Sequence, residues 1–296
     1  MSDVILSLGF GLVTASILAM GAVGFTLQFG VTNLFNLAFG EVMTISMFAS
    51  FLVHIDGGYN MWVAMAAGGL MGMIASFVMA RLLYMPFINR GTPRSVMVIV
   101  TVAAAIIIKN VAQIFSGADF YSLALPPQDP VHILGMVFTP RQLAVMALSA
   151  ACMLGLHLLF KYTRLGKAMR ATSDDPELAR SCGVPTTRII SAAWLLSGLL
   201  AGFAGVALAM TLGTFDTNTG SSFLLVVVAA AVFGSVGEPY GAMVGALVLG
   251  VVSELAALVN PDLKSVAAFT ILVIVLLVRP AGLRGGRVMT AGEMAA

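Results

Sequence analysis

Charged residues are scarce in this sequence. Only 9% of the 296 residues are Asp, Glu, Lys or Arg, whereas a soluble domain carries about 25%. The chain is also 59% hydrophobic, with a mean hydropathy of +1.02. A surface with so little charge faces lipid rather than water. We therefore expect an integral membrane protein rather than a soluble one.

Two further scarcities narrow the class of protein. Of only two cysteines, Cys152 lies in an apolar run and Cys182 in a charged segment, so neither a disulfide nor a metal site is expected. The stretch from Met1 to Met20 contains no Lys or Arg, which the first part of a signal peptide requires. The first apolar run is therefore expected to remain as a membrane span.

Motifs of catalysis are lacking as well. No nucleophile–base constellation and no metal-binding spacing such as His-Glu-x-x-His occurs. The stretch LGKA resembles the end of a phosphate-binding loop, but Lys161 stands where that loop needs Gly, and Ala168 replaces its Ser or Thr. We expect no catalytic residue, no metal and no cofactor, and the chain is not expected to be an enzyme.

Apolar runs, by contrast, are abundant, and a helix needs about 20 apolar residues to cross a bilayer. The candidate spans are Val4–Leu27, Asn33–Val53, Met61–Tyr84, Ser95–Phe115, Gln142–Phe160, Ile189–Leu212, Tyr240–Val259 and Val266–Val278. A further run, Ser221–Val236, is shorter and could be a short span or half of a broken helix. The sequence predicts an all-α fold, a polytopic transmembrane helical bundle that forms one domain over residues 1–296.

The distribution of charge predicts the orientation. The main basic clusters are Arg81, Arg90 and Arg94; Lys161, Arg164, Lys167, Arg170, Arg180 and Arg188; and Arg279, Arg284 and Arg287. Segments rich in Lys and Arg stay in the cytoplasm, and the other side is mainly acidic. An N-terminus outside and a C-terminus inside then require an odd number of crossings. The sequence predicts about nine spans, with eight as the alternative.

Polar residues within the second apolar run are Asn33, Asn36, Gly40 and Glu41. An ionisable group at this depth costs about 2.5–3.5 kcal/mol, so it needs a partner or a role. The spacing of three to four residues predicts that all four lie near one helix face. They could line a water-filled route for a substrate, or they could form a hydrogen-bond cluster between helices.

The charged segment 161–188 contains signals for a short helix. Ser173 and the two acids after it precede Pro176, which is favoured in a first helical turn, and Glu177 suits the positive end of the helix dipole. Gly183 suits a left-handed cap after the last turn, and Pro185 prevents continuation. A helix of two turns is unstable alone, so we expect it to dock on a partner. The alternative is a solvated basic loop that only sets the topology.

Taken in order, these stretches resemble the permease subunits of branched-chain amino acid ABC importers, the LivH-like half. Asn36, Ala38, Gly40 and Glu41 match the pattern N-x-A-x-G-E, although Phe39 stands where that family usually has His. The matching loop residues are Gly166, Arg170, Asp175, Pro176, Glu177, Ala179 and Gly183. The stretches AAAVFGSVGEPYGAMVGALVLGVVSEL and VRPAGLRG resemble two further segments of that family.

The resemblance implies a multi-pass subunit of the bacterial inner (plasma) membrane that forms half of a translocation pathway. Its implied partners are a second related permease, two ATP-binding subunits that hydrolyse the ATP, and an extracytoplasmic substrate-binding protein. Segment 161–188 would couple the chain to an ATP-binding subunit, and the polar residues from Asn33 to Glu41 would line the pathway. Membrane lipid surrounds such a subunit, and no nucleic acid is expected.

The substrate stays open at this point. Branched-chain amino acids are the default of the family, and urea, amides and aromatic acids are alternatives. An ion-coupled secondary transporter or a passive channel is the alternative class, but neither needs a short cytoplasmic helix shaped to dock on a partner.

Overall fold

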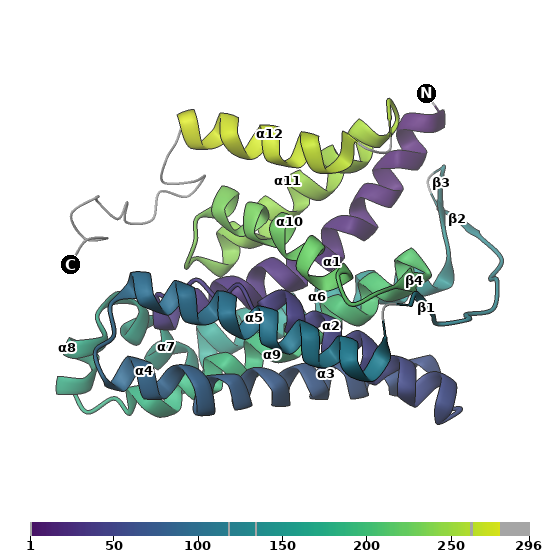
Figure 1. Cartoon of the computed structure of the whole chain (residues 1–296). Helices are drawn as coiled ribbons and strands as arrows, with labels where there is room; N and C mark the ends of the chain where they lie inside the picture. The colour runs from purple at the N-terminus through teal and green to yellow at the C-terminus, as the bar shows by residue number, and fades with distance from the viewer. Residues whose placement is uncertain (1, 118, 134, 261–262, 279–296) are drawn as a thin grey trace.

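A computed structural model of the chain describes residues 2–117, 119–133, 135–260 and 263–278. Arg279, Arg284 and Arg287, with nearly all of the motif VRPAGLRG, lie outside the described residues, as does the predicted cytoplasmic C-terminus. The chain is predominantly helical (Figure 1).

The longer elements agree well with the apolar runs. The α-helices are α1 (Ser2–Thr32), α2 (Phe39–Phe51), α3 (Met61–Val78), α4 (Met85–Asn89), α5 (Arg94–Ser116), α6 (Pro140–Tyr162), α7 (Arg164–Asp174), α8 (Pro176–Ser181), α9 (Thr186–Leu212), α10 (Thr219–Gly234), α11 (Pro239–Ala257) and α12 (Leu263–Val278). Two π-helical segments, Leu52–Asp56 and Met79–Tyr84, continue α2 and α3.

Short strands close one end of the bundle. Strand β1 (Tyr121–Ser122) pairs antiparallel with β4 (Thr214–Phe215), and β2 (Val131–Ile133) pairs antiparallel with β3 (Met136–Phe138). We call this the strand end. Helices α7 and α8 lie at the opposite end, which we call the α8 end (Figure 1).

Seven helices of the described residues are long and apolar enough to cross a membrane: Val4–Thr32, Phe39–Asp56, Met61–Ile88, Ser95–Ser116, Pro140–Tyr162, Thr186–Leu212 and Pro239–Ala257. Two shorter apolar helices, Thr219–Gly234 and Val266–Val275, correspond to the remaining predicted runs. The chain is thus a polytopic helical membrane protein, as predicted. The prediction for the second run was wrong at its start, because the helix begins at Phe39 and not at Asn33.

Close backbone contacts between small residues position the helices. A Cβ atom at Gly198 of α9 would clash with the carbonyl oxygen of Gly72 in α3, and one at Gly72 would clash with the carbonyl oxygen of Gly198. Similar contacts join Gly234 of α10 to Gly241 of α11. Lipid tails are as apolar as Leu side chains, so helices in a bilayer associate through close packing of this kind.

Replacing Gly198 with Ala should destabilise the protein, because the added methyl group has no room between α3 and α9. Overpacking of this kind costs about 1–3 kcal/mol. The control is Gly155→Ala in α6, where an added Cβ meets nothing within 4 Å. Thermal unfolding in detergent should show a lower midpoint for Gly198→Ala only. Equal midpoints for the two variants would contradict the tight crossing.

Candidate functional site

The chain between α1 and α2 is not helical, and this corrects the prediction that Asn33, Asn36, Gly40 and Glu41 share one helix face. Helix α1 ends at Thr32, and Asn33 has a φ of 50°, a left-handed conformation that Asn tolerates better than most residues. The six residues from Asn33 to Ala38 then form an irregular stretch, which we call the return segment. A spacing of three to four residues fits a helix, but it does not require one.

The return segment folds back along α1. Phe39, the first residue of α2, packs edge-on against Phe25 with ring centroids 5.7 Å apart. Phe25 lies about two turns before the end of α1. Irregular backbone at membrane depth is tolerated only where protein buries it or where it lines a cavity. Here protein buries it, and Thr101 of α5 donates a hydrogen bond of 3.1 Å to the carbonyl oxygen of Phe35.

A cluster of buried polar side chains holds the return segment in place. Asn36 is 2% exposed, and its Oδ1 accepts hydrogen bonds from the Tyr84 hydroxyl (2.9 Å) and from the backbone N–H of Ala38 (3.1 Å). The Asn36 Nδ2 donates to Oε1 of Gln28, which also accepts from the Ser197 hydroxyl, each at 3.4 Å. We call Gln28, Asn36, Tyr84 and Ser197, with the Trp194 ring 5.0 Å from that of Tyr84, the polar cluster.

The polar cluster retains unused hydrogen-bonding capacity. Gln28 Nε2 and Trp194 Nε1 are buried, and neither has a hydrogen-bond partner among the described residues. Glu41 is 3% exposed in the first turn of α2, and its Oε2 is also buried without a hydrogen-bond partner among the described residues. Unpaired buried polar groups are few in native proteins and often mark a ligand site or bound water. The cluster also includes the last residue of a π-helical segment, a feature that often accompanies functional sites.

Gly40 and Glu41 lie where two helix N-termini meet. A Cβ atom at Gly40 would come within 2.8 Å of the carbonyl oxygen of Gly220, the second residue of α10. Only glycine fits at such an approach. The positive ends of the dipoles of α2 and α10 therefore lie close together, and the carboxylate of Glu41 is favourably placed near one of them.

The short helix predicted in segment 161–188 is present as α8, Pro176–Ser181. The side chain of Asp175 caps it by accepting from the N–H groups of Glu177 (3.0 Å) and Leu178 (2.9 Å). Gly183 follows with a φ of 83°, as a left-handed cap requires. The prediction that Ser173 starts this helix was wrong, because Ser173 lies near the end of α7, a helix that was not predicted.

The seven predicted coupling residues divide by position. Gly166 packs against the backbone of Leu159 and Phe160, and Arg170 donates to the carbonyl oxygen of Phe160 (3.2 Å), so both fix α7 to the end of α6. On α8, Glu177 is exposed and Ala179 is buried at 5% exposure. Leu178, which was not among the predicted coupling residues, is 61% exposed.

Some residues of the site could not be predicted from the sequence. Gln28, Tyr84 and Ser197 come from α1, the segment after α3, and α9, and each has an ordinary sequence context. Their one common signal is a polar group within an apolar run. The exposure of Leu178 has a clearer signal in the sequence. It is a large apolar residue between Glu177 and Ala179 in a charged segment, where a two-turn helix has no apolar core to bury it.

Removing the hydroxyl of Tyr84 should destabilise the chain, because Asn36 then loses a buried donor. A buried group left without its partner costs about 1–3 kcal/mol. The control is Tyr162→Phe, which removes the same hydroxyl from a side chain that is 68% exposed. We expect Tyr84→Phe to lower the thermal midpoint and Tyr162→Phe to leave it unchanged. An unchanged midpoint in both would show that this hydrogen bond does not hold the return segment.

Comparison with known proteins gives the family. The family model described as the branched-chain amino acid transport system / permease component matches residues 7–276. BraD of Pseudomonas aeruginosa, a high-affinity branched-chain amino acid transport system permease protein, is 31% identical over 93% of this chain and 94% of its own. LivH of Salmonella typhimurium, with the same description, is 29% identical over 93% of both chains.

A more distant relative is archaeal. A probable branched-chain amino acid transport permease protein of Methanocaldococcus jannaschii is 24% identical over 82% of this chain and 78% of its own. No solved structure matches the chain. The chain belongs to the family of permease components of branched-chain amino acid ABC transport systems and is a multi-pass protein of the inner (plasma) membrane.

Proposed function

We propose that this chain is one of two related permease subunits that together enclose a pathway for branched-chain amino acids. The described functions of LivH and BraD, which match the chain over nearly its whole length, support this substrate. The chain acts as a single domain over residues 1–296. Two ATP-binding subunits hydrolyse the ATP, and an extracytoplasmic binding protein delivers the substrate.

The observation that carries the coupling part of the proposal is the surface of α8. Asp175 and Gly183 cap a helix too short to be stable alone, and it projects Leu178 with Glu177 beside it. A large apolar side chain on a charged loop at one end of a membrane protein suits an apolar pocket on a soluble partner. We assign that partner to the ATP-binding subunit.

Motion of α8 can reach the membrane helices through α7. A Cβ atom at Gly30, near the end of α1, would lie 3.4 Å from the hydroxyl of Ser173 in α7 and 3.2 Å from the carbonyl oxygen of Gly237, between α10 and α11. These three segments therefore meet just before the return segment. A displacement of α7 would act on α1 and on the α10–α11 connection together.

The pathway lies along the return segment in this proposal. Asn33 is half-buried, whereas Asn36, Gly40 and Glu41 are buried within the single subunit. Broken helices whose N-termini point into the membrane interior form substrate sites in many transporters. Alternating access would open the packing around these four residues, and the unpaired groups of Gln28 and Glu41 would then hydrogen-bond to the substrate or to its water.

The orientation follows from the basic residues. Lys161 and Arg188 flank α7 and α8, and Lys167 lies within α7, so we place the α8 end in the cytoplasm and the strand end outside. Counting the two shorter helices α10 and α12 with the seven longer ones gives nine crossings, with the N-terminus outside and the C-terminus inside.

Truncating Leu178 to Ala should uncouple the transporter. Loss of a central apolar contact weakens an interface by about 1–2 kcal/mol, which is about 5- to 30-fold in affinity. In membranes containing the complete transporter, we expect reduced co-purification of the ATP-binding subunits and reduced uptake of leucine. The control is Leu82→Ala, which truncates a side chain that is 73% exposed on the segment after α3. Wild-type assembly and uptake with Leu178→Ala would refute the coupling role.

A further inference from the structure

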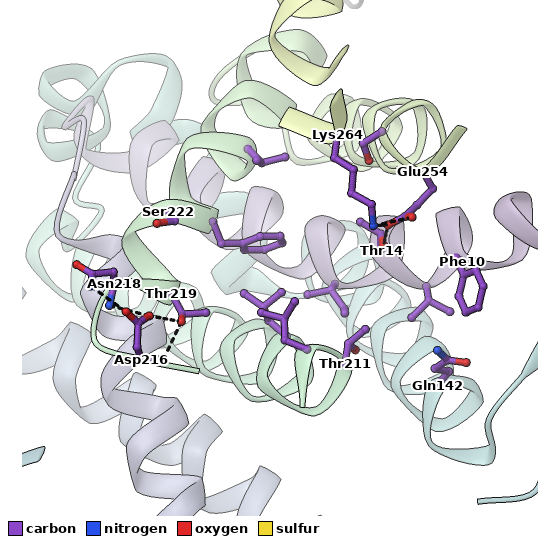
Figure 2. A pocket seen from close by; sticks show the side chains of 17 residues that line it. Phe10, Thr14, Gln142, Thr211, Asp216, Asn218, Thr219, Ser222, Glu254 and Lys264 are labelled. Carbon is purple, nitrogen blue, oxygen red and sulfur yellow. Dashed lines mark hydrogen bonds and ion pairs between the residues drawn. The ribbon is translucent and has the colours of Figure 1, made fainter. Parts of the chain in front are cut away.

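A cavity opens at the strand end, away from the polar cluster and α8. Its volume is about 770 Å³, within the range of pockets that bind small molecules. Helices α1, α6, α9, α10, α11 and α12 contribute to its lining (Figure 2). It therefore lies where six helices from the beginning, middle and end of the chain come together.

One wall of the cavity carries an ion pair. Lys264, at the start of α12, lies 2.8 Å from each oxygen of the Glu254 carboxylate at the end of α11. Thr14 of α1 also donates to Glu254 at 2.8 Å (Figure 2). The Lys264 side chain is 46% exposed and that of Glu254 is 12% exposed. The Lys264 end of this ion pair is open to solvent, and ion pairs at the surface contribute little stability. A ligand that supplies both charges can therefore pair with Lys264 and with Glu254 in place of their bond to each other.

A second acidic residue in the cavity, Asp216, already accepts hydrogen bonds from neighbouring side chains. The Asp216 carboxylate accepts hydrogen bonds from the Thr219 hydroxyl (2.6 Å) and from Asn218 Nδ2 (2.8 Å) (Figure 2). Partial burial alone would raise the pKa of Asp216, but these hydrogen bonds hold it below its ordinary value. Asp216 thus shapes the turn before α10, and Glu254 is the carboxylate that a cationic group of a ligand would meet.

Much of the remaining lining is apolar. Ile17 of α1, Leu208 of α9, and Phe223 and Val226 of α10 all line the cavity. Their side chains offer an aliphatic and aromatic surface facing the space next to the ion pair. A ligand that fits this lining has a positive group, a negative group and an apolar side chain.

We propose that this cavity is an outer binding site for a zwitterionic α-amino acid with an apolar side chain. The substrate carboxylate binds the ammonium of Lys264, the substrate ammonium binds the carboxylate of Glu254, and the side chain contacts Ile17, Phe223 and Val226. The inference rests on the proposed function and extends it, because it gives the permease its own contacts with the substrate.

The position of the cavity suits a substrate moving inward. Thr219 lines the cavity, and the next residue, Gly220, contacts Gly40 of α2. The first turn of α10 therefore separates the cavity from Gly40 and Glu41. A shift of α10 away from α2 would join the cavity to the pathway proposed above.

The test measures protection of a cysteine by substrate. Ser222 lines the cavity and is exposed, so Ser222→Cys is introduced together with Cys152→Ala in the assembled transporter. The native Cys182, exposed beside α8, stays as an internal control. A water-soluble thiol reagent labels both cysteines, and peptide mass spectrometry gives the two rates with leucine, 3-methylbutylamine or 4-methylpentanoate present. The two analogues lack the carboxylate and the ammonium of leucine, respectively.

We expect leucine at about ten times its dissociation constant to slow labelling at position 222 about tenfold and to leave Cys182 unchanged. Neither analogue should protect, and leucine should no longer protect in Glu254→Gln/Lys264→Met, which removes both charges without leaving either one unpaired. Protection that persists in this double variant would contradict the assigned contacts.

The same preparation separates the two proposals. Unchanged labelling in a transporter that imports leucine would overturn the cavity site and leave the proposed function intact. If the transporter does not import leucine, the branched-chain assignment fails, and labelling with a panel of other zwitterionic amino acids decides on the cavity. Protection by one of them would support the site, and protection by none would overturn it.

Discussion

Direct contact between glycine backbones is the constraint on which this structure depends. Gly72 with Gly198, Gly40 with Gly220, and Gly234 with Gly241 each leave no space for a side chain between the two helices. In a bilayer such contacts replace the hydrophobic driving force of a soluble core, because close approach gains dispersion energy that lipid tails cannot match. They fix α3 against α9, α2 against α10, and α10 against α11.

This packing also explains why polar groups persist within the bundle. The contact at Gly40 holds the start of α2 against α10, so the chain leaving α1 must turn back through the protein interior. Irregular backbone there needs hydrogen-bond partners: the Asn36 side chain accepts from the N–H of Ala38, and Thr101 donates to the carbonyl oxygen of Phe35. Gln28 and Tyr84 in turn hold the Asn36 side chain in place. The same turn lies between two other features: the junction of α1 with α7, and the cavity beside α10. The return segment thus lies where a displacement of α7 at one end of the molecule could be transmitted to the cavity at the other end.

The sequence predicted features that rest on local chemistry. Hydropathy located the helices, and Pro176 and Gly183 bounded α8, because caps and breakers act within a few residues. The prediction from sequence failed where contacts between residues far apart in the chain determine the conformation. The polar spacing from Asn33 to Glu41 suited a helix, yet Asn33 turns left-handed and Asn36 bonds to a tyrosine 48 positions away. Nor could it reveal the cavity, whose Thr14 and Glu254 are 240 positions apart.

The central claim is that the interrupted stretch between α1 and α2 lines an ATP-driven route. The most direct measurement uses Glu41→Cys in a Cys152→Ala/Cys182→Ser background, reconstituted with the ATP-binding subunits and the binding protein. A small water-soluble thiol reagent is applied with no nucleotide, with a non-hydrolysable ATP analogue and during ATP turnover. The account predicts that position 41 is labelled in at least one of these states and that its rate of labelling differs between them. Complete protection of position 41 in every state would contradict it and would leave the polar residues a purely structural role.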